Sequence, residues 1–151
     1  MRTIKKYAST LPVVALCVLV LGSAVALSQK KFMMLRSGSP AVKVMLSGAN
    51  EVPPVTTSAS GDGTISIADD GAVSGSVTSK GVQGTAAHIH AGAAGKNGPV
   101  IVPFTKEGDT YKAPAGAKLN ADQMTALKAG ELYFNVHSAA NPGGEIRGQL
   151  K

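Results

Sequence analysis

The sequence predicts an all-β fold, an antiparallel β-sandwich with one short connecting helix, for residues 41–151. Three observations predict it. Short segments that alternate between apolar and polar residues recur along this part of the chain, and turn-forming residues separate them. Small and β-branched residues dominate the composition, while aromatic residues make up only 4%. Seven or eight short strands of this kind are typical of a sandwich, with an open barrel as the alternative.

The first strands have the clearest pattern. Residues 41–47 place Val42, Val44 and Leu46 on one face and Lys43, Met45 and Ser47 on the other, as in a half-buried strand. The pair Asp70-Gly71 lies between two alternating segments, residues 61–67 and 72–78, and such a pair is a strong signal for a β-hairpin. Further strands are predicted at residues 84–90, 100–105, 110–112, 131–137 and 145–150.

One helix is predicted between these strands, at residues 121–128. Asn120 stands at the N-cap position, and Gly130 follows the last turn, where a glycine commonly ends a helix. The segment is short, so we expect it to connect strands and not to form a second layer.

The positive charge is concentrated in the first forty residues. The formal net charge is +6, but residues 41–151 contain nine basic and nine acidic side chains. The remaining six basic residues precede position 40, with no acidic residue among them: Arg2, Lys5, Lys6, Lys30, Lys31 and Arg36. A neutral domain has no basic surface for phosphates, so no nucleic-acid partner is expected.

The N-terminus has the pattern of an export signal. Three basic residues precede an uncharged, largely apolar stretch at residues 11–27, and Ala24-Val25-Ala26 resembles a signal-peptidase site. We therefore predict a cleaved signal peptide at residues 1–26 and a basic linker at residues 27–40. If the signal is not cleaved, residues 11–27 become a membrane anchor. The protein is accordingly expected to be exported, as a periplasmic, cell-surface or secreted protein, or to stay anchored in the membrane.

The only cysteine, Cys17, lies inside the apolar stretch. The domain therefore has no disulfide and no thiolate ligand or nucleophile, as suits an oxidising compartment.

Three histidines are the candidate metal ligands of the domain. His88 and His90 are two residues apart on a predicted strand, so they share a face, and His137 lies on the non-core face of another strand. If these strands are neighbours, three imidazoles converge. Neutral imidazoles without a thiolate suit copper, and zinc less well, with the fourth position open to water, substrate, Glu51 or Glu145. Because only neutral imidazole binds a divalent metal, we expect affinity to fall as the pH drops through about 6.5.

Structural roles compete with this interpretation. Histidines on strands often only hydrogen-bond a loop. The prolines at positions 53 and 54 cannot donate to a sheet and are predicted to end the first strand, with Glu51 capping a turn. Glu145 and Arg147 share a face, where they can pair with each other or with the loop after His137. We expect a structural salt bridge between them, or otherwise a guide for an anionic ligand. Five glycines are expected to adopt positive φ: Gly92, Gly95, Gly98, Gly143 and Gly144.

Three segments carry a resemblance to a known family. Residues 46–55 (LSGANEVPPV), 87–92 (AHIHAG) leading to 98–100 (GPV), and 132–150 (LYFNVHSAANPGGEIRGQL) are similar to the CHRD domain, which occurs in chordin and in many exported bacterial proteins. Ser138 replaces a threonine common in the family. The resemblance implies an extracytoplasmic module with an immunoglobulin-like or superoxide-dismutase-like sandwich, but it implies no settled activity.

The sequence therefore predicts a non-catalytic CHRD module outside the cytoplasm that binds a metal ion through His88, His90 and His137. Supporting residues or a fourth ligand are expected among Glu51, Asn135, Glu145 and Arg147. The first alternative is a metal-free protein-interaction or adhesion module with an extracellular protein partner. The second is an enzyme similar to superoxide dismutase, but three histidines are too few for the two metals of that enzyme class.

Overall fold

The computed structural model describes residues 41–151. The signal peptide or anchor predicted at residues 1–26 and the linker predicted at residues 27–40 lie outside the described residues. Among the described helices, none has the length and apolar character needed to cross a membrane.

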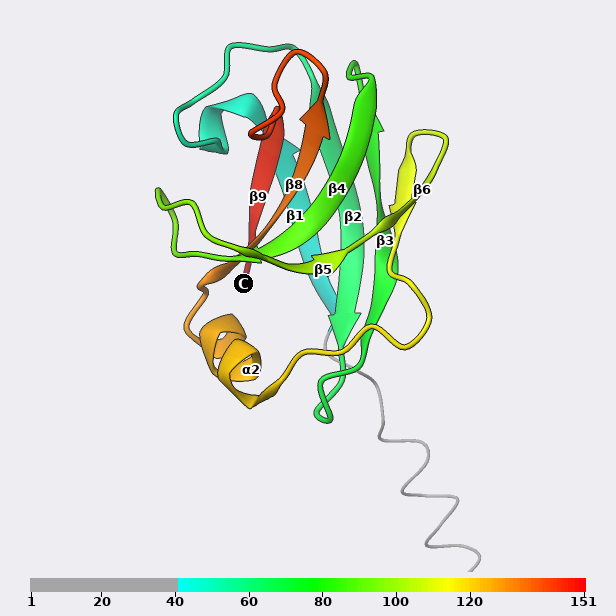
Figure 1. The fold of residues 1–151 in the computed structure, drawn as a ribbon, viewed down its shortest axis with the longest axis vertical. Helices are drawn as coiled ribbons and strands as arrows, with labels where there is room; N and C mark the ends of the chain where they lie inside the picture. The colour runs from blue at the N-terminus through cyan, green and yellow to red at the C-terminus, as the bar shows by residue number, and fades with distance from the viewer. Residues whose placement is uncertain (1–40) are drawn as a thin grey trace, which may run out of the picture. The chain divides into compact units, whose positions relative to one another are not determined.

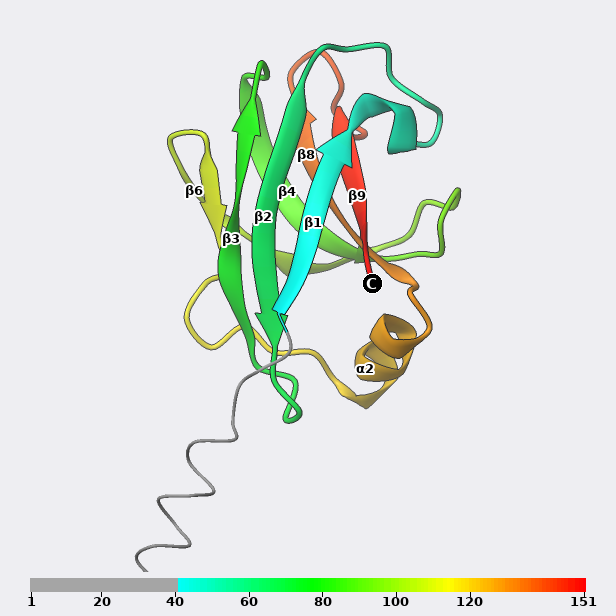
Figure 2. The same ribbon diagram turned by 180° about the vertical axis from the view of Figure 1, so that it is seen from behind.

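Nine antiparallel strands form one continuous sheet, in the order β5-β4-β8-β9-β1-β2-β3-β7-β6 (Figures 1 and 2). The prediction of an all-β antiparallel fold is thus confirmed. The strands are β1 (Ala41–Ser47), β2 (Ser60–Ile67), β3 (Val73–Lys80), β4 (Gly84–Ala91), β5 (Val100–Pro103), β6 (Thr105–Glu107), β7 (Thr110–Lys112), β8 (Leu132–Ser138) and β9 (Ile146–Leu150). A short 3₁₀ helix, η1 (Gly48–Asn50), follows β1, and the helix α2 (Ala121–Lys128) precedes β8.

The sheet folds back on itself and is nearly closed. The strands β4, β8 and β9 lie in front of β1, β2 and β3 in Figure 1, and the order is reversed in Figure 2. Apolar side chains from both halves fill the space between them, among them Ile89, Phe134 and Ile146 from one half and Val44, Ile65 and Val77 from the other. The architecture therefore combines the layers of a sandwich with the near closure of a barrel.

The strand patterns read from the sequence hold in the structure. In β1, Val44 and Leu46 are buried, while Met45 between them is 80% exposed. The hairpin between β2 and β3 turns at Gly71, which has φ +89°, and the side chain of Asp70 accepts a hydrogen bond from the Ala72 N–H. Helix α2 has the predicted bounds, and the Asn120 side chain accepts a hydrogen bond from the Gln123 N–H at 2.9 Å.

One predicted strand is divided in two. The prediction of a single strand at residues 100–105 is wrong, because the chain changes partner at Phe104: β5 pairs with β4, whereas β6 pairs with β7. The Phe104 N–H still donates to the Ala87 carbonyl of β4, at 2.9 Å, and the ring is buried in the core. Since β5 and β6 are the two edge strands of the sheet, the chain at Phe104 connects one edge directly to the other.

The first strand ends earlier than its prolines suggest. β1 stops at Ser47, where η1 begins, and the N–H groups of Glu51 and Val55 both donate to the Gly48 carbonyl. The prediction that Pro53 and Pro54 end the strand is therefore wrong: a turn held by the Gly48 carbonyl does so first.

Candidate metal centre

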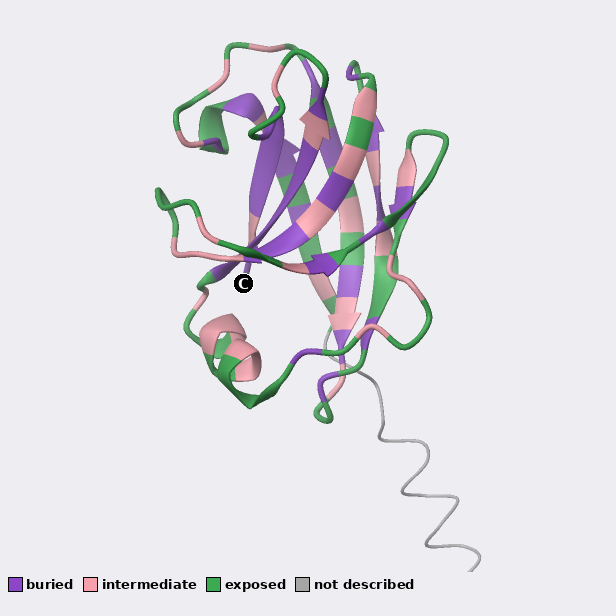
Figure 3. Ribbon diagram, viewed as in Figure 1, coloured by how far each residue is buried: buried purple, intermediate pink, exposed green. Residues whose placement is uncertain are grey.

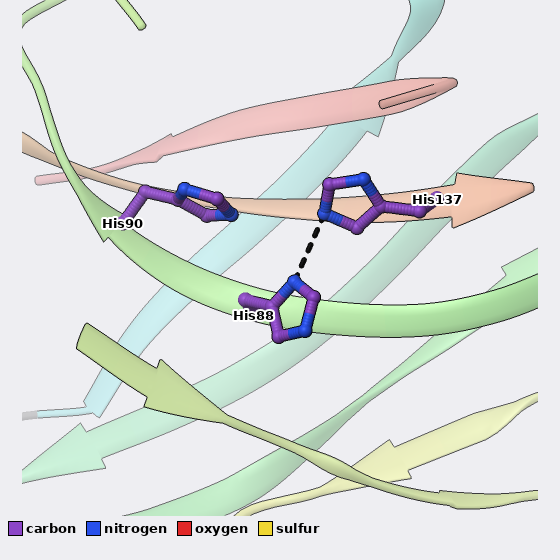
Figure 4. Close-up of side chains that lie close together, drawn as sticks. All are labelled: His88, His90 and His137. Atoms are coloured by element: carbon purple, nitrogen blue, oxygen red, sulfur yellow. Dashed lines mark hydrogen bonds between the residues drawn. The ribbon is translucent and has the colours of Figure 1, made fainter. Parts of the chain in front are cut away.

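The pairing of β4 with β8 brings the three histidines together. His90 lies opposite Tyr133, and the small residue Ala86 lies opposite His137. One nitrogen from each of His88, His90 and His137 lies within 4.8 Å of the other two (Figure 4). The expectation that two neighbouring strands make the imidazoles converge is thus confirmed, and the core side of the same strands holds Ile89 and Phe134, both fully buried.

Irregular pairing on both sides of β4 adjusts the position of its histidines. The register with β8 shifts between Gly84 and Ala86, and the register with β5 shifts between Ile89 and His90. Bulges of this kind bend a strand and re-aim its side chains. With only a methyl group at Ala86, the ring of His88 leans toward His137, and His88 Nδ1 lies 2.9 Å from His137 Nε2.

Backbone carbonyls determine which nitrogen of two histidines carries the proton. His90 Nδ1 lies 2.9 Å from the Gly98 oxygen, and His137 Nδ1 lies 2.9 Å from the Pro142 oxygen. A carbonyl only accepts, so Nδ1 must be the protonated nitrogen, and Nε2 of each neutral ring carries the lone pair. This is the arrangement of metal-binding histidines, whose second nitrogen usually donates to a carbonyl or carboxylate.

The same reasoning assigns the contact between His88 and His137. Because His137 Nε2 carries a lone pair, His88 Nδ1 is the donor of their hydrogen bond. A metal ion that takes His88 Nδ1 as a ligand therefore requires the proton to move from Nδ1. Two ligands bound to one ion at about 2.0–2.1 Å in tetrahedral geometry are about 3.3 Å apart, only slightly more than the 2.9 Å between these nitrogens.

Burial keeps two of the imidazoles neutral. The pKa of His88 is lowered to about 4, first by burial and then by the nearby His137 and His90. Burial also lowers the pKa of His90, against the opposite effect of its bond to the Gly98 carbonyl. His90 is only 7% exposed, and its Nε2 has no hydrogen-bond partner. A buried lone pair without a donor is costly unless a ligand uses it.

Gly98 allows the loop between β4 and β5 to reach His90. A Cβ atom at this position would lie 1.5 Å from the Ala91 carbonyl oxygen, so no other residue fits. The carbonyl of Gly98 accepts from His90, and its N–H donates to the Tyr133 hydroxyl at 3.2 Å. Of the five glycines expected to have positive φ, only Gly95 and Gly144 do, so the expectation is wrong for Gly92, Gly98 and Gly143. Position 98 requires glycine because its backbone lies so close to the Ala91 carbonyl, not because of its φ angle.

A stack of three side chains lies beside the histidines. The Tyr133 ring is parallel to that of His90, with centroids 4.8 Å apart, and the Arg147 guanidinium lies 3.3 Å from the centre of the Tyr133 ring. Tyr133 and Arg147 are 2% and 1% exposed. These residues point away from the core and are nevertheless buried, like most of β8 and β9, which are largely purple in Figure 3.

Arg147 holds the loop between β4 and β5. Its guanidinium donates to the carbonyls of Ala93 and Lys96, at 3.1 and 2.9 Å, and to the Asn97 side chain. The expected salt bridge with Glu145 is wrong, because within residues 41–151 these two side chains form no ion pair. Glu145 instead accepts from the Thr57 hydroxyl at 3.0 Å, and contacts with Ser138, followed by Thr57, lower the pKa of its carboxyl.

Glu51 and Asn135 lie together on the other side of Arg147. Glu51 is 4% exposed and Asn135 is 1% exposed. Burial raises the pKa of Glu51, while the charge of Arg147 and the nearby Asn135 amide act in the opposite direction. A Cβ atom at Gly144 would lie 2.4 Å from Glu51 Oε1 and 2.6 Å from Asn135 Nδ2, so this glycine leaves room for both groups.

A groove of about 780 Å³ opens next to these residues. Glu51 and Arg147 contribute to its lining, together with the exposed Met45 and the amines of Lys43 and Lys151. None of the three histidines lines it, so the groove and the candidate metal centre are separate features.

The sequence prediction did not assign a role to Tyr133 or to the carbonyls of Gly98 and Pro142. The period of two along β8 places Tyr133 on the face of Asn135 and His137, so a signal for it existed. Nothing in a sequence pattern indicates which loop carbonyl reaches an imidazole.

The family model described as the CHRD domain matches residues 42–150. The chain belongs to the CHRD family. No curated protein and no solved structure matches the chain. The matched region of the CHRD domain contains the three histidines and all four residues expected to support them, so the candidate centre is built entirely from the family's own segments.

Proposed function

We propose that this CHRD domain is a non-catalytic module that binds a metal ion, copper in preference to zinc, outside the cytoplasm. The observation that supports this most strongly is the hydrogen bonding of His90 and His137. Each ring uses Nδ1 to bond a backbone carbonyl, which leaves the lone pair on Nε2, unpartnered in His90 and bonded only to His88 in His137, within a group of three ligand nitrogens. Imidazole ligands without thiolate suit copper, which binds a given nitrogen site more tightly than zinc does.

A metal-free interaction module is the second candidate. The same bonds from His90 and His137 tie two loops to the sheet, and that role alone requires no metal. The unpartnered, buried Nε2 of His90 favours the metal-binding proposal, because a purely structural histidine has no use for it. A dismutase-like enzyme has less support, because only three histidines converge and the domain contains no cysteine for a disulfide.

Metal analysis of the purified protein, with and without added copper, tests the proposal. We expect one copper ion per chain after dialysis, and weaker retention of zinc. A protein that retains no copper, and whose thermal unfolding is unchanged by copper or zinc, would instead favour the interaction module.

Export is expected from the N-terminal pattern. The basic residues before the apolar stretch and Ala24-Val25-Ala26 predict cleavage after Ala26. N-terminal sequencing of the protein from the extracytoplasmic fraction should therefore begin at or near Leu27. Recovery of the chain with residues 1–26 intact in the membrane fraction would identify an anchor instead.

The metal-free domain should lose stability between about pH 6.5 and pH 4. The folded pKa of His88 is about 4, below its ordinary value of 6.5, so in this window the unfolded chain binds a proton that the folded chain does not. The free energy of unfolding therefore falls as the pH is lowered through the window. Urea unfolding at pH 7, 5.5 and 4.5 measures it, and His88→Gln should reduce the slope. An equally steep slope in His88→Gln would contradict this assignment.

The lowered pKa also changes the expected pH range of metal loss at His88. Protons begin to compete with a metal ion for an ordinary imidazole near pH 6.5, whereas they compete for His88 only near pH 4.

A further inference from the structure

Four buried side-chain atoms among residues 41–151 have no hydrogen-bond partner, and three of them lie at one place. They are His90 Nε2, Asn135 Oδ1 and Glu51 Oε1. All three are lone-pair acceptors when the ring is neutral and the carboxyl is ionised. His90 Nε2 and Asn135 Oδ1 belong to neighbouring residues on the outer face of β4 and β8, and two buried acceptors without a donor are unfavourable, so the pair indicates a missing positive charge.

The Asn135 amide lies between the other two groups. Its Nδ2 is 3.5 Å from the Gly143 carbonyl and close to the Glu51 carboxylate, so the NH₂ end faces these acceptors. Its Oδ1 must then face the other way, toward the histidines. The effects on the neighbours agree: the amide lowers the pKa of Glu51, as a donor does, and raises the pKa of His90, as an acceptor does.

The position of Asn135 in the sheet places it at the centre of the histidine cluster. It lies directly opposite His88 on β4 and two residues before His137 on the same face of β8. Directly opposite residues have Cβ atoms about 4.5–5.5 Å apart, within reach of a shared ion. His90, which lies opposite Tyr133 on β4, is the diagonal neighbour of Asn135.

We propose that Asn135 Oδ1 is the fourth ligand of the metal ion and that Glu51 orients the amide for this purpose. The inference rests on the proposed function, since it concerns the same site. It assigns a donor set of three imidazole nitrogens and one amide oxygen. Mixed nitrogen and oxygen donors in tetragonal geometry suit Cu²⁺, whereas Cu⁺ prefers the sulfur ligands that this set lacks.

Glu51 acts behind the ligand. Its carboxyl group lies beside the NH₂ end of Asn135, and this contact favours the orientation with Oδ1 toward the ion. Burial raises the pKa of Glu51, and the charge of the nearby Arg147 opposes this rise. Glu51 is therefore a positioning residue, while Asn135 contacts the ion.

The test uses the purified protein loaded with Cu²⁺. Electron paramagnetic resonance should show coupling to three imidazole nitrogens, and proton ENDOR spectra in H₂O and D₂O should not differ by a strongly coupled exchangeable proton. Asn135→Asp, which replaces the amide oxygen by a charged one, should raise copper affinity about tenfold. Asn135→Leu should lower it about tenfold and admit water, with an exchangeable proton appearing. Glu51→Gln should weaken binding severalfold and leave the three-nitrogen coupling unchanged.

The control is Gln149→Leu. This amide lies on the same outer face, on the adjacent strand β9, and its NH₂ group bonds the carbonyls of Gly92 and Gly130. Its replacement should leave copper affinity and spectrum unchanged.

The outcomes separate the two proposals. Copper bound by three nitrogens with a strongly coupled exchangeable proton in the unmodified protein would place water at the fourth position and overturn the role of Asn135 alone. The same conclusion follows if Asn135→Asp folds and binds copper exactly as the unmodified protein does. Failure of the unmodified protein to bind copper at all would overturn the proposed function, and this inference with it.

Discussion

His137→Ala should lower copper affinity by at least about a hundredfold. His137 is the only histidine that β8 contributes, so its replacement removes one of three imidazoles and leaves His88 and His90 on a single strand. Loss of a group that only supports a ligand typically costs 10–100-fold, and loss of the ligand itself should cost more. Isothermal titration of both proteins with Cu²⁺ at pH 7 measures the effect.

Thr85→Ala is the matched control for this prediction. The Thr85 hydroxyl donates to the His137 carbonyl at 3.2 Å, so the variant disturbs the same contact between strands without removing a ligand nitrogen. Circular dichroism verifies that both variants keep the fold, because His137→Ala also breaks the bond to the Pro142 carbonyl. Equal stoichiometry and affinity in His137→Ala and the unmodified protein would mean that the three-histidine site is wrong.

Arg147→Met should lower the free energy of unfolding by about 3–5 kcal/mol, as expected when one partner of a buried charged network is removed. The side chain is 1% exposed. Methionine retains much of its length but leaves the carbonyls of Ala93 and Lys96 without their donor and the Glu51 carboxylate without a nearby cation. Domains of this size are stable by about 5–15 kcal/mol, so this is a large fraction. Urea unfolding at pH 7 without metal measures the change.

Two further variants test whether the loss of stability is specific to the buried guanidinium. Arg147→Lys should recover little, since an ammonium cannot reproduce the planar fork that bonds two carbonyls while stacking on Tyr133. Lys112→Met breaks an ion pair with Glu107 in which both side chains are about half exposed, and should change stability by less than about 1 kcal/mol. An Arg147→Met protein as stable as Lys112→Met would show that the buried network contributes little.

Local features were predictable because neighbouring residues determine them. The alternation of β1 and β4 fixes which side chains enter the core, and Asn120 and Gly130 mark the ends of α2 without reference to any distant residue. The hairpin at Gly71 depends on a backbone conformation that glycine adopts easily. For the same reason, the shared face of His88 and His90 followed from their spacing.

Features that depend on distant partners were not predictable in this way. The passage from β5 to β6 at Phe104 depends on where β4 and β7 lie, and no local pattern contains that information. The predicted strand at residues 145–150 puts Arg147 and Glu145 on one face, but β9 begins only at Ile146, and loops from elsewhere in the chain supply partners to each: the carbonyls at positions 93 and 96 for Arg147, and Thr57 for Glu145.

The family, the antiparallel all-β class and the three candidate ligand histidines could be predicted without a structure, because they depend on motifs and on the period of a strand. The folded chain was needed to show that β4 and β8 are neighbours, that the carbonyls of Gly98 and Pro142 leave the lone pairs of His90 and His137 on Nε2, and that Asn135 faces the cluster. A ligand site needs a shared point in space and a defined position for each proton. Contacts between residues far apart in the chain determine both.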